Sequence, residues 1–362
     1  PVGAVGVVTP WNYPLALTML DVIPALAAGN AVVQKADDKT IKTIVAARDL
    51  AERSGLPVGL WQVVHGDNEI IGNGLVDACD YLAFTGSTQT GKKVAQRAAG
   101  RLIGYSMELG GKNPAIVLPG AEMEKTSERL LASFIGNSGQ LCVATERAYV
   151  PRQELKGYVD VLTNKIESLK LGSSEVFDHD LGALVSAEQI TRVSGFLERA
   201  KNSGSKVIGG SVDGRLLRPS LVTETDHRSE IASQEVFGPV LAIIPYDTVD
   251  QAIEMANDTD YGLNASVFGN ISDAQKVAKK LQAGTVNINE GYRASMASLD
   301  APMGGMKQSG VGRRNGIAGI RRFTEPRTIA INKGLVELPS RGSHYNRMAP
   351  LMGIISKVMK RF

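Results

Sequence analysis

Short apolar stretches alternate with amphipathic ones along the first hundred residues, a pattern that predicts strands and helices in turn. Strands are expected at residues 31–34, 61–64, 81–84 and 102–109, and helices at residues 39–53 and 91–99. A glycine and then a proline follow the helix at 39–53, which is the usual signal that a helix ends. The apolar, β-branched strands favour a parallel sheet covered by helices on both faces, and hence an α/β fold.

The pattern continues beyond residue 120 and predicts a second α/β unit. The first stretch ends with a strand expected at residues 115–118. Beyond it, strands are expected at residues 148–150, 206–208, 240–244 and 265–268, and helices around 130–135 and at 156–169 and 187–203. The end of the chain differs, because residues 341–362 hold five Lys or Arg and no acid. Two interpretations of this tail stay open: a basic amphipathic helix that contacts a membrane surface or a partner, and a solvated terminus.

Composition and charge exclude several classes of protein. The 362 residues are 43% hydrophobic and 21% charged, as in an ordinary globular protein. This length suggests about two or three domains. A net charge of +3 gives no nucleic-acid footprint, and no apolar run is long enough to cross a membrane.

The cysteine and histidine content indicates a reducing compartment and no metal. Two cysteines cannot form a disulfide framework, and four scattered histidines without a Cys-x-x-Cys motif predict no metal site. We therefore expect a cytoplasmic protein with free thiols. No signal peptide is visible, and the chain begins inside an apolar run typical of the middle of a strand, so we expect it to be cut at its N-terminal end.

Cys142 and Glu108 are the candidate catalytic residues. A thiolate is the competent nucleophile, and a helix N-terminus or a positive charge near Cys142 would lower its pKa. Glu108 ends a predicted strand, where ligand sites of parallel sheets lie, and a partly desolvated carboxylate there could act as a general base. The alternatives are an inert buried cysteine and a solvated loop acid. Cys79 precedes an apolar strand and is expected to serve packing.

Three further candidates lie in rigid loops or at predicted strand ends. Asn12 lies between two prolines, so its amide could stabilise an oxyanion or could serve the turn itself. Gly86 and Ser87 lie between a strand and a helix, a junction that could bind phosphate or form a plain tight turn. Lys35 follows a strand and is either a ligand-binding residue or an ordinary surface lysine.

Taken together, these segments resemble the aldehyde dehydrogenase superfamily. In chain order they are Pro10-Trp11-Asn12-Tyr13-Pro14, Lys35, Phe84-Thr85-Gly86-Ser87, Glu108-Leu109-Gly110-Gly111-Lys112, Gly139-Gln140-Leu141-Cys142, Glu235-Val236-Phe237-Gly238-Pro239, Gly284-Thr285-Val286-Asn287 and Pro302-Met303-Gly304-Gly305-Met306-Lys307. Each segment alone is modest evidence, whereas the whole set in the family's order is specific. The resemblance covers residues 1–332 and leaves out the N-terminal stretch of the family, which carries the first part of its cofactor domain.

The resemblance implies a fold and a reaction. The fold would combine a Rossmann-type cofactor domain with an α/β catalytic domain and a C-terminal oligomerisation strand. The expected boundaries are residues 1–109 for the incomplete cofactor domain, 110–305 for the catalytic domain, 306–335 for the return to the cofactor domain and the oligomerisation strand, and 336–362 for the basic tail. The reaction would be the NAD- or NADP-dependent oxidation of an aldehyde, in a homodimer or homotetramer when full length.

The resemblance also implies roles for individual residues. Cys142 would attack the aldehyde carbon, the Asn12 amide and the Cys142 backbone N–H would hold the alkoxide, and Glu108 would activate the water that hydrolyses the thioester. The residues expected to bind the cofactor are Trp11, Lys35, Asp38, Gly86, Ser87, Leu109, Glu235 and Phe237. Among them, Lys35 would bind the adenosine ribose and Glu235 the nicotinamide ribose.

Cofactor and substrate preference depend on a few positions. Asp38 falls where the family often has an acid that favours NAD, whereas Lys39 and Lys42 leave NADP open. Residues 34–37, 289–293 and 299–307 look similar to succinate-semialdehyde dehydrogenases of the actinobacterial type. Arg293 is then the candidate for binding the substrate carboxylate, with a structural arginine as the alternative. Ala144 stands where some members carry a second cysteine, so no thiol redox switch is expected.

Two other functions stay open. A Cys-Glu-Lys hydrolase would use Cys142 and Glu108 without a nucleotide, and it would make no reduced nicotinamide from an aldehyde. An inactive paralogue would keep the fold for binding or assembly, and it would show no saturable cofactor binding.

Overall fold

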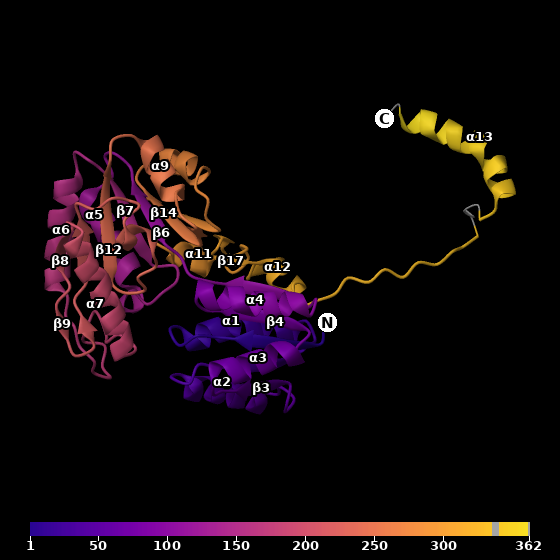
Figure 1. Ribbon diagram of the computed structural model, residues 1–362, viewed down its shortest axis with the longest axis horizontal. Coiled ribbons are helices and arrows are strands. Elements are labelled where there is room, and N and C mark those ends of the chain that lie inside the picture. The colour runs from indigo at the N-terminus through magenta and orange to yellow at the C-terminus, as the bar shows by residue number, and fades with distance from the viewer. Residues whose placement is uncertain (335–339, 361–362) are drawn as a thin grey trace. The chain divides into compact units, whose positions relative to one another are not determined.

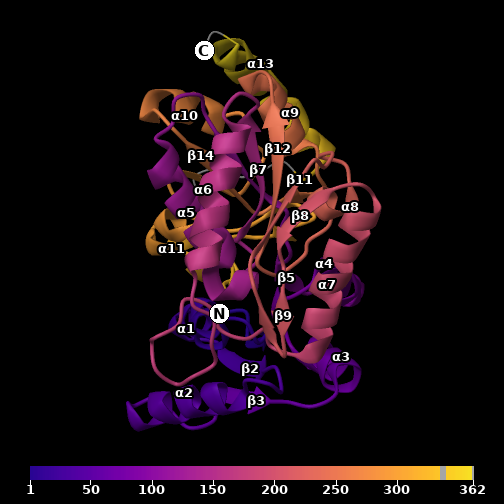
Figure 2. The same ribbon diagram turned by 90° about the vertical axis from the view of Figure 1, so that its left-hand side faces the viewer.

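A computed structural model describes residues 1–334 and 340–360 of the chain. The chain divides into two units, Pro1–Glu325 and Pro326–Phe362. The first unit holds two mainly parallel sheets covered by helices (Figures 1 and 2). The second contains the helix α13 (Gly342–Met359).

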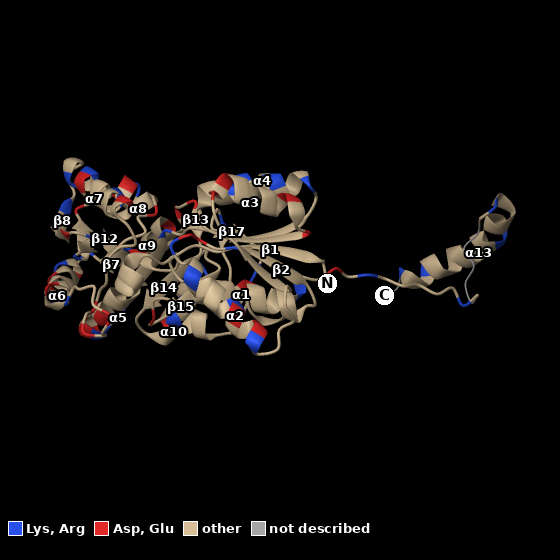
Figure 3. Cartoon of the chain, turned by 90° about the horizontal axis from the view of Figure 1, so that it is seen from below, with Lys and Arg blue, Asp and Glu red and all other residues tan. Residues whose placement is uncertain are grey.

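The first sheet has six strands in the order β17-β5-β4-β1-β2-β3. Its strands are β1 (Ala4–Val8), β2 (Ala31–Lys35), β3 (Trp61–Val64), β4 (Tyr81–Thr85), β5 (Gly104–Glu108) and β17 (Gly310–Val311), and its helices are α1 (Pro14–Ala27), α2 (Ile41–Arg53), α3 (Asn68–Ala78) and α4 (Thr88–Gly100). Neighbouring strands pair in parallel, except that β17 is antiparallel to β5. Figure 3 shows α1 and α2 on one face of this sheet and α3 and α4 on the other.

Apolar side chains on both faces bury this sheet between its helices. Val5 and Val7 pack on the side of α1 and α2, whereas Leu82 and Phe84 pack on the side of α3 and α4. Because successive side chains of a strand point to opposite faces, each continuous apolar run packs against the helices on both faces of the sheet. Cys79 is buried in the α3–α4 cluster, in agreement with the packing role expected for it.

The second sheet has seven strands in the order β15-β14-β6-β7-β12-β11-β8. Its strands are β6 (Asn113–Val117), β7 (Thr145–Pro151), β8 (Lys206–Gly209), β11 (Ser220–Thr223), β12 (Val240–Tyr246), β14 (Asn264–Phe268) and β15 (Thr285–Ile288), and its main helices are α5 (Met123–Ile135), α6 (Leu155–Ser168), α7 (Ala187–Asn202), α9 (Val249–Asn257) and α10 (Ile271–Ala278). Only β8 runs antiparallel to its neighbour in this sheet.

Strand β12 illustrates how the second sheet is buried. Leu241 and Ile243 pack in the cluster formed with α5 and α6, and Ala242 and Ile244 pack in the cluster formed with α9 and α10. The shorter elements are η1 (Gly136–Gly139), β9 (Val212–Asp213), β10 (Leu216–Leu217), α8 (Glu230–Ser233), β13 (Tyr261–Gly262), α11 (Arg293–Ala297), β16 (Met306–Lys307) and α12 (Gly316–Arg321).

The predicted α/β fold is confirmed, with two local differences. Pro14 does not simply stiffen a connection, because it begins helix α1, a position where its missing N–H costs nothing. Antiparallel strands close one edge of each sheet. Residues 324–333 form neither helix nor strand in the single chain, so the expected intersubunit strand stays a prediction.

The strand order of the first sheet indicates where a ligand-binding site lies. The chain moves outward from β1 through β2 to β3 and then crosses to the other side of β1 with β4 and β5. The strand order therefore reverses between β1 and β4, and ligands of open α/β sheets bind at the carboxyl ends of the strands at such a point. Asn12, Ser87 and Glu108 follow or end β1, β4 and β5.

Candidate active site

A pocket of about 380 Å³ lies where the strand order of the first sheet reverses, and its volume is in the range of small-molecule sites. Nine of the predicted site residues line it, namely Trp11, Asn12, Gly86, Ser87, Glu108, Leu109, Cys142, Glu235 and Phe237. These residues come from five separate stretches of the chain, so the fold rather than the local sequence brings them together.

The thiol of Cys142 is presented by a tightly wound loop. Asn137 and the two residues after it have positive φ angles, and that of Gly139 is 71°. A side chain at Gly139 would place its Cβ 2.1 Å from the carbonyl carbon of Gly238, so only glycine fits there. The carbonyl of Cys142 accepts a hydrogen bond from Asn113 Nδ2 at 2.7 Å. The nucleophile candidate is therefore fixed by its backbone.

The Cys142 thiol holds its proton at neutral pH. Burial, followed by the carboxylates of Glu235 and Glu108, raises the pKa of the thiol to about 12. The positive charge of Arg314 lowers this pKa, but less strongly than the two carboxylates raise it. Burial also raises the pKa of Glu108 and that of Glu235 to about 7. Both carboxyl groups can therefore exchange a proton near neutral pH.

The side chain of Asn12 joins the loop after β1 to the loop before Cys142. Its Nδ2 donates to the carbonyl of Gln140 at 3.0 Å, and Asn137 Nδ2 donates to the carbonyl of Asn12 at 2.9 Å. Since an amide nitrogen carries two hydrogens, one fixes the orientation and the second is left for a ligand. Asn12 Oδ1 is buried and has no partner among the described residues.

A buried ion network lies beside Glu108. Asp21 of α1 pairs with Arg314 and with Arg322, each at 2.5 Å. Arg314 also donates to the hydroxyl of Thr85 at 2.5 Å, and Thr85 is the register partner of Glu108 between β4 and β5. Burial alone would raise the pKa of Asp21, but the two arginines hold it below its usual value. Arg314 also opposes the rise that burial causes in the pKa of Glu108.

Glu108 offers the pocket an unsatisfied oxygen. It is the last residue of β5 and is buried, and its Oε1 has no hydrogen-bond partner in the part of the chain that the structure describes. A buried polar atom without a partner is costly and is usually explained by function or by a bound molecule. Oε1 is therefore available to a water or a ligand.

The carboxyl group of Glu235 reaches across to the segment that carries Glu108. Its Oε1 accepts a hydrogen bond from the backbone N–H of Gly111 at 3.0 Å. A side chain at Gly110 would place its Cβ 2.5 Å from a Glu235 carboxyl oxygen, so a glycine is required for this approach.

A buried ion pair fixes the loop that contains Glu235. Lys112 Nζ lies 2.6 Å from Glu146 Oε2, and both side chains are almost fully buried. The Glu146 carboxylate also accepts hydrogen bonds from the backbone N–H groups of Val236 at 2.9 Å and Phe237 at 2.8 Å. The charge of Glu146 is thus compensated by one cation and two amides, as a buried carboxylate requires.

Side chains of α7 hold the carbonyl groups of the same loop. Arg192 donates to the carbonyls of Glu235 at 2.7 Å and Val236 at 3.0 Å, and Gln189 donates to that of Phe237 at 2.7 Å. Phe237 has a φ of 57°, which is unusual for a bulky residue. These bonds hold the Phe237 ring edge-on to that of Trp11, with centroids 5.7 Å apart.

Three predicted site residues do not line the pocket. Lys35 is buried at the end of β2, and Asp38 lies just beyond it, exposed, where it accepts a hydrogen bond from the N–H of Gly66 at 3.1 Å. Arg293 is exposed at the first residue of α11. Its charge opposes the rise that burial and Tyr292 cause in the pKa of Tyr13, the residue after Asn12.

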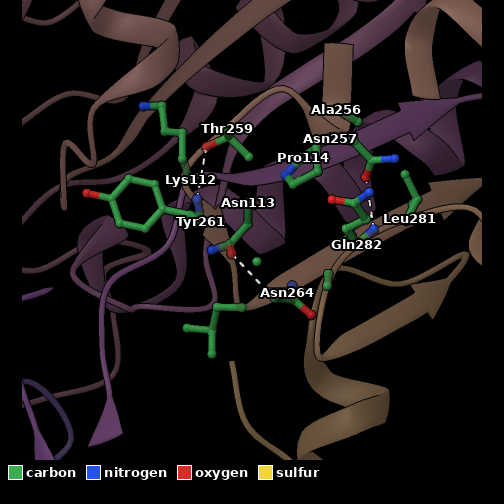
Figure 4. Close-up of a pocket in the computed structure, with 14 residues that line it drawn as sticks. Lys112, Asn113, Pro114, Ala256, Asn257, Thr259, Tyr261, Asn264, Leu281 and Gln282 are labelled. Atoms are coloured by element: carbon green, nitrogen blue, oxygen red, sulfur yellow. Dashed lines mark hydrogen bonds between the residues drawn. The ribbon is translucent and has the colours of Figure 1, made fainter. Parts of the chain in front are cut away.

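A second pocket is lined by residues 112–114, which follow the segment that begins at Glu108 (Figure 4). Lys112, Asn113 and Asn264 are among its lining residues. Asn113 uses both ends of its amide, because Oδ1 accepts from the N–H of Asn264 at 3.0 Å while Nδ2 supports the Cys142 carbonyl. This pocket therefore belongs to the polar support of the nucleophile loop.

Sequence reasoning missed Glu146, Arg192 and Arg314. Each acts on a residue far away in the chain, and none lies in a recognisable motif. A signal existed only for Glu146, which with Arg147 interrupts the otherwise uncharged strand β7. Charged residues are rarely fully buried unless they are paired, so a charge in a predicted buried strand points to a partner.

Comparisons with known proteins agree with this geometry. A model of the aldehyde dehydrogenase family matches residues 1–329. A Mycobacterium tuberculosis protein named "Putative succinate-semialdehyde dehydrogenase [NADP(+)] 2" is 45% identical over 91% of this chain and 65% of its own length. A Mycolicibacterium smegmatis protein named "Putative succinate-semialdehyde dehydrogenase [NADP(+)]" is 43% identical over 100% of this chain and 72% of its own. The chain thus spans about two thirds of the length of such relatives.

Solved structures give the same result. The crystal structure of a Mycobacterium tuberculosis aldehyde dehydrogenase complexed with NAD+ superposes with a TM-score of 0.88 at 35% identity, covering 93% of this chain and 71% of that one. That of betaine aldehyde dehydrogenase from Staphylococcus aureus with NAD+ superposes with a TM-score of 0.85 at 33% identity, covering 89% and 66%. The family match over residues 1–329 and these likenesses show that the chain belongs to the aldehyde dehydrogenase family.

Proposed function

We propose that this chain supplies the cofactor site and the catalytic residues of an NAD- or NADP-dependent aldehyde dehydrogenase that oxidises succinate semialdehyde to succinate. The observation that carries the proposal is the meeting of Cys142, Glu108 and Asn12 in one pocket at the point where the strand order reverses. A nucleophile, a base and an amide donor are the groups that oxidation through a covalent thioester needs.

The first role of the site is to make a thiolate. A thiol with a pKa of about 12 is protonated at pH 7, so the proton must pass to a neighbouring group as the sulfur attacks. Glu108, with a pKa of about 7, is ionised in a sufficient fraction to accept it. The sulfur then bonds to the aldehyde carbon, and the carbonyl electron pair moves to the oxygen.

The second role is to hold that oxygen as an alkoxide. The Asn12 amide, fixed by its bond to Gln140, still has an N–H to donate, and the backbone N–H of Cys142 is the proposed second donor. Donors fixed in advance stabilise charge better than water does, because they need no reorganisation. A protein typically loses about 3 kcal/mol of transition-state stabilisation when one such donor is removed.

The residues fit a nicotinamide dinucleotide. The pocket lies at the expected edge of the sheet, Ser87 caps the N-terminus of α4, and Asn12 Oδ1 and Glu108 Oε1 are buried without partners among the described residues. Glu235, Phe237 and Trp11 would hold the nicotinamide half, and Gly86, Ser87 and Leu109 would lie near the phosphates, with Lys35 and Asp38 toward the adenosine ribose. When bound, the cofactor supplies the acceptor for the hydride of the former aldehyde carbon.

The last role of the site is hydrolysis. After oxidation, the substrate carbon is a thioester of Cys142, and water must attack it. Once Glu108 has released the proton of the thiol to solvent, its ionised form can take a proton from that water and pass it to the departing sulfur, so that the acid is released and the thiol of Cys142 is restored. The balance is one aldehyde, one oxidised cofactor and one water converted to one acid, one reduced cofactor and one proton.

The substrate proposal rests on Arg293 and on the relatives. Tyr292 packs in the apolar cluster that includes Cys142, and Arg293 follows it with its side chain exposed. A guanidinium can bind a carboxylate through two hydrogen bonds, so Arg293 is the proposed partner of the carboxylate of the substrate. The names of the mycobacterial relatives point to the same substrate class.

The remaining proposals concern assembly and location. Residues 323–332 are exposed for the most part and carry no strand in the single chain, which leaves them able to pair with another subunit of a homodimer or homotetramer. Both cysteines are free, and a catalytic thiol needs a reducing compartment, so we place the protein in the cytoplasm.

An aldehyde panel tests the proposal. Succinate semialdehyde and a neutral aldehyde of equal length are supplied with NAD or NADP, and reduced nicotinamide is followed by its absorbance. We expect turnover that is fastest with succinate semialdehyde. Absence of reduced cofactor with every aldehyde, while the protein hydrolyses an activated ester, would favour a Cys-Glu-Lys hydrolase instead.

A further inference from the structure

Helix α13 lies beyond the residues matched by the family model, which end at residue 329, so the family's shared chemistry does not account for it. Its exposed apolar side chains are Tyr345, Leu351, Met352, Ile354, Ile355, Val358 and Met359. A helix with so many exposed apolar groups needs something to cover them.

Most of these apolar side chains gather on one side of the helix, whereas Ile354 falls on the other side, near Arg347. Tyr345, Met348, Met352, Ile355 and Met359 are spaced by three, four, three and four residues, which places them in one stripe. Leu351 and Val358 widen this stripe on one flank, by the same spacing rule. The resulting apolar face runs along the whole helix.

The opposite side is basic. Lys357 and Lys360 fall on the polar side, and Arg347 stands at the border of the apolar face. Residues 341–362 hold five Lys or Arg and no acid. Figure 3 shows only blue charged positions on α13. A positive polar side beside an apolar face complements a surface that is apolar inside and negatively charged outside.

The helix does not suit a position across a membrane. Among the described residues, no helix is long and apolar enough to cross one. Pro350 lies inside α13, where it removes a backbone hydrogen bond and weakens the helix in water. Such a helix gains stability when an interface covers its apolar face, as interfacial amphipathic helices do.

A tether precedes the helix. Residues 326–334 are exposed and form neither helix nor strand. Fully extended, these residues span about 30 Å at roughly 3.3 Å per residue. These residues separate the helix, along the chain, from the unit that contains the Cys142 pocket.

We propose that residues 341–360 bind the surface of a bilayer that contains anionic lipid. The apolar face, defined by Tyr345, Met348, Met352, Ile355 and Met359, lies at the boundary of head groups and acyl chains. Arg347, Lys357 and Lys360 contact lipid phosphates, where each adds attraction that is screened by salt. This binding is independent of the aldehyde chemistry, and it concentrates the protein at a membrane surface.

Vesicle flotation of the whole chain tests this proposal. Vesicles of phosphatidylcholine alone are compared with vesicles that also contain phosphatidylglycerol, at about 0.1 M salt, where the screening length is about 10 Å. We expect flotation with the anionic vesicles, little with the neutral ones, and release as salt is raised. Equal binding to both vesicle types, or no binding to either by a folded protein, would overturn the proposal.

Two variants and a control locate the binding surface. Ile355→Asp puts a charge in the apolar face, and the triple change Arg347→Glu, Lys357→Glu and Lys360→Glu reverses the basic side. Each should lower the vesicle partition coefficient at least tenfold. Ile271→Asp, at an exposed position on α10, should leave the partition coefficient unchanged. If Ile355→Asp instead dissociates an oligomer in light scattering while vesicle binding persists, a second copy rather than lipid covers the face, and the proposal fails.

Discussion

Lys112 Nζ lies 2.6 Å from Glu146 Oε2, in a pair that joins the two halves of the site. Lys112 follows the segment that begins at Glu108, while Glu146 holds the backbone N–H groups of Val236 and Phe237. This buried ion pair therefore contributes to the position of the Glu235 loop relative to the base. Because neither charge is solvated, loss of one partner leaves the other uncompensated.

We expect Lys112→Met to lower the free energy of unfolding by about 3–5 kcal/mol, the usual cost of an unpaired buried charge. Urea unfolding followed by circular dichroism measures it. Lys93→Met, on the exposed side of α4, is the matched control and should change stability by less than about 0.5 kcal/mol. Equal effects of the two changes would show that the pair is not an essential part of the fold.

Asn12→Ala should slow hydride transfer by about 10²–10³-fold, because one oxyanion donor is lost. Cofactor affinity, measured by fluorescence titration, should change little. Asn137→Gly is the control, since it removes the hydrogen bond to the Asn12 carbonyl and keeps a residue that tolerates the φ of 51°. A comparable loss of rate in both variants would assign the effect to the loop rather than to the amide.

Glu108→Gln should stabilise the protein above pH 7. Burial raises the pKa of Glu108 from 4.5 to about 7, so the folded state binds this proton more tightly than the unfolded chain does. The free energy of unfolding therefore falls as the pH rises from 4.5 to about 7. The loss reaches about 3 kcal/mol, at about 1.36 kcal/mol per pH unit. The variant lacks this loss, so its advantage should appear above pH 7 and vanish below pH 4.5.

Thermal unfolding across this pH range measures the effect. Glu69→Gln, an exposed position on α3, serves as the control and should follow the parent protein at every pH. Parallel stability curves for Glu108→Gln and the parent would contradict the raised pKa.

Arg293→Met should raise KM for succinate semialdehyde about 10–100-fold, since a charged hydrogen bond is worth about 1.5–3 kcal/mol. KM for a neutral aldehyde of equal length should stay the same. Arg321→Met, exposed at the end of α12, is the matched control. An equal rise of KM for both aldehydes would show that Arg293 supports the loop and does not bind the carboxylate.

Much of the fold was accessible from the sequence because its signals are local. The apolar runs of β2, β3 and β4 and the helix α2 lie within a few residues of the predicted bounds. Glu108 and Lys35 were placed at strand ends for the same reason. Helix α1 was missed because Pro14, which begins it, favours a rigid connection when only the spacing of prolines is considered.

The pKa shifts and ion pairs of the site could not be predicted from local sequence patterns. The pKa of Cys142 rises because of burial and of Glu235, which is 93 positions away in the chain and meets the thiol only in the folded protein. Arg314 and Asp21 are separated by 293 positions and form a pair that no local pattern indicates. Motif order predicted which residues meet, whereas three-dimensional packing decides their charge states.

A single-turnover measurement tests the central claim most directly. Reduced nicotinamide is followed after each protein is mixed with cofactor and aldehyde in excess. Glu108→Gln should give one burst of reduced nicotinamide and then stall, because the thioester is not hydrolysed. The burst should be slower than that of the parent protein, because Glu108 no longer accepts the proton of the thiol. Cys142→Ala should give no burst, while Cys79→Ala, which changes only a buried packing residue, should turn over repeatedly. A burst from Cys142→Ala would contradict a covalent role for that sulfur.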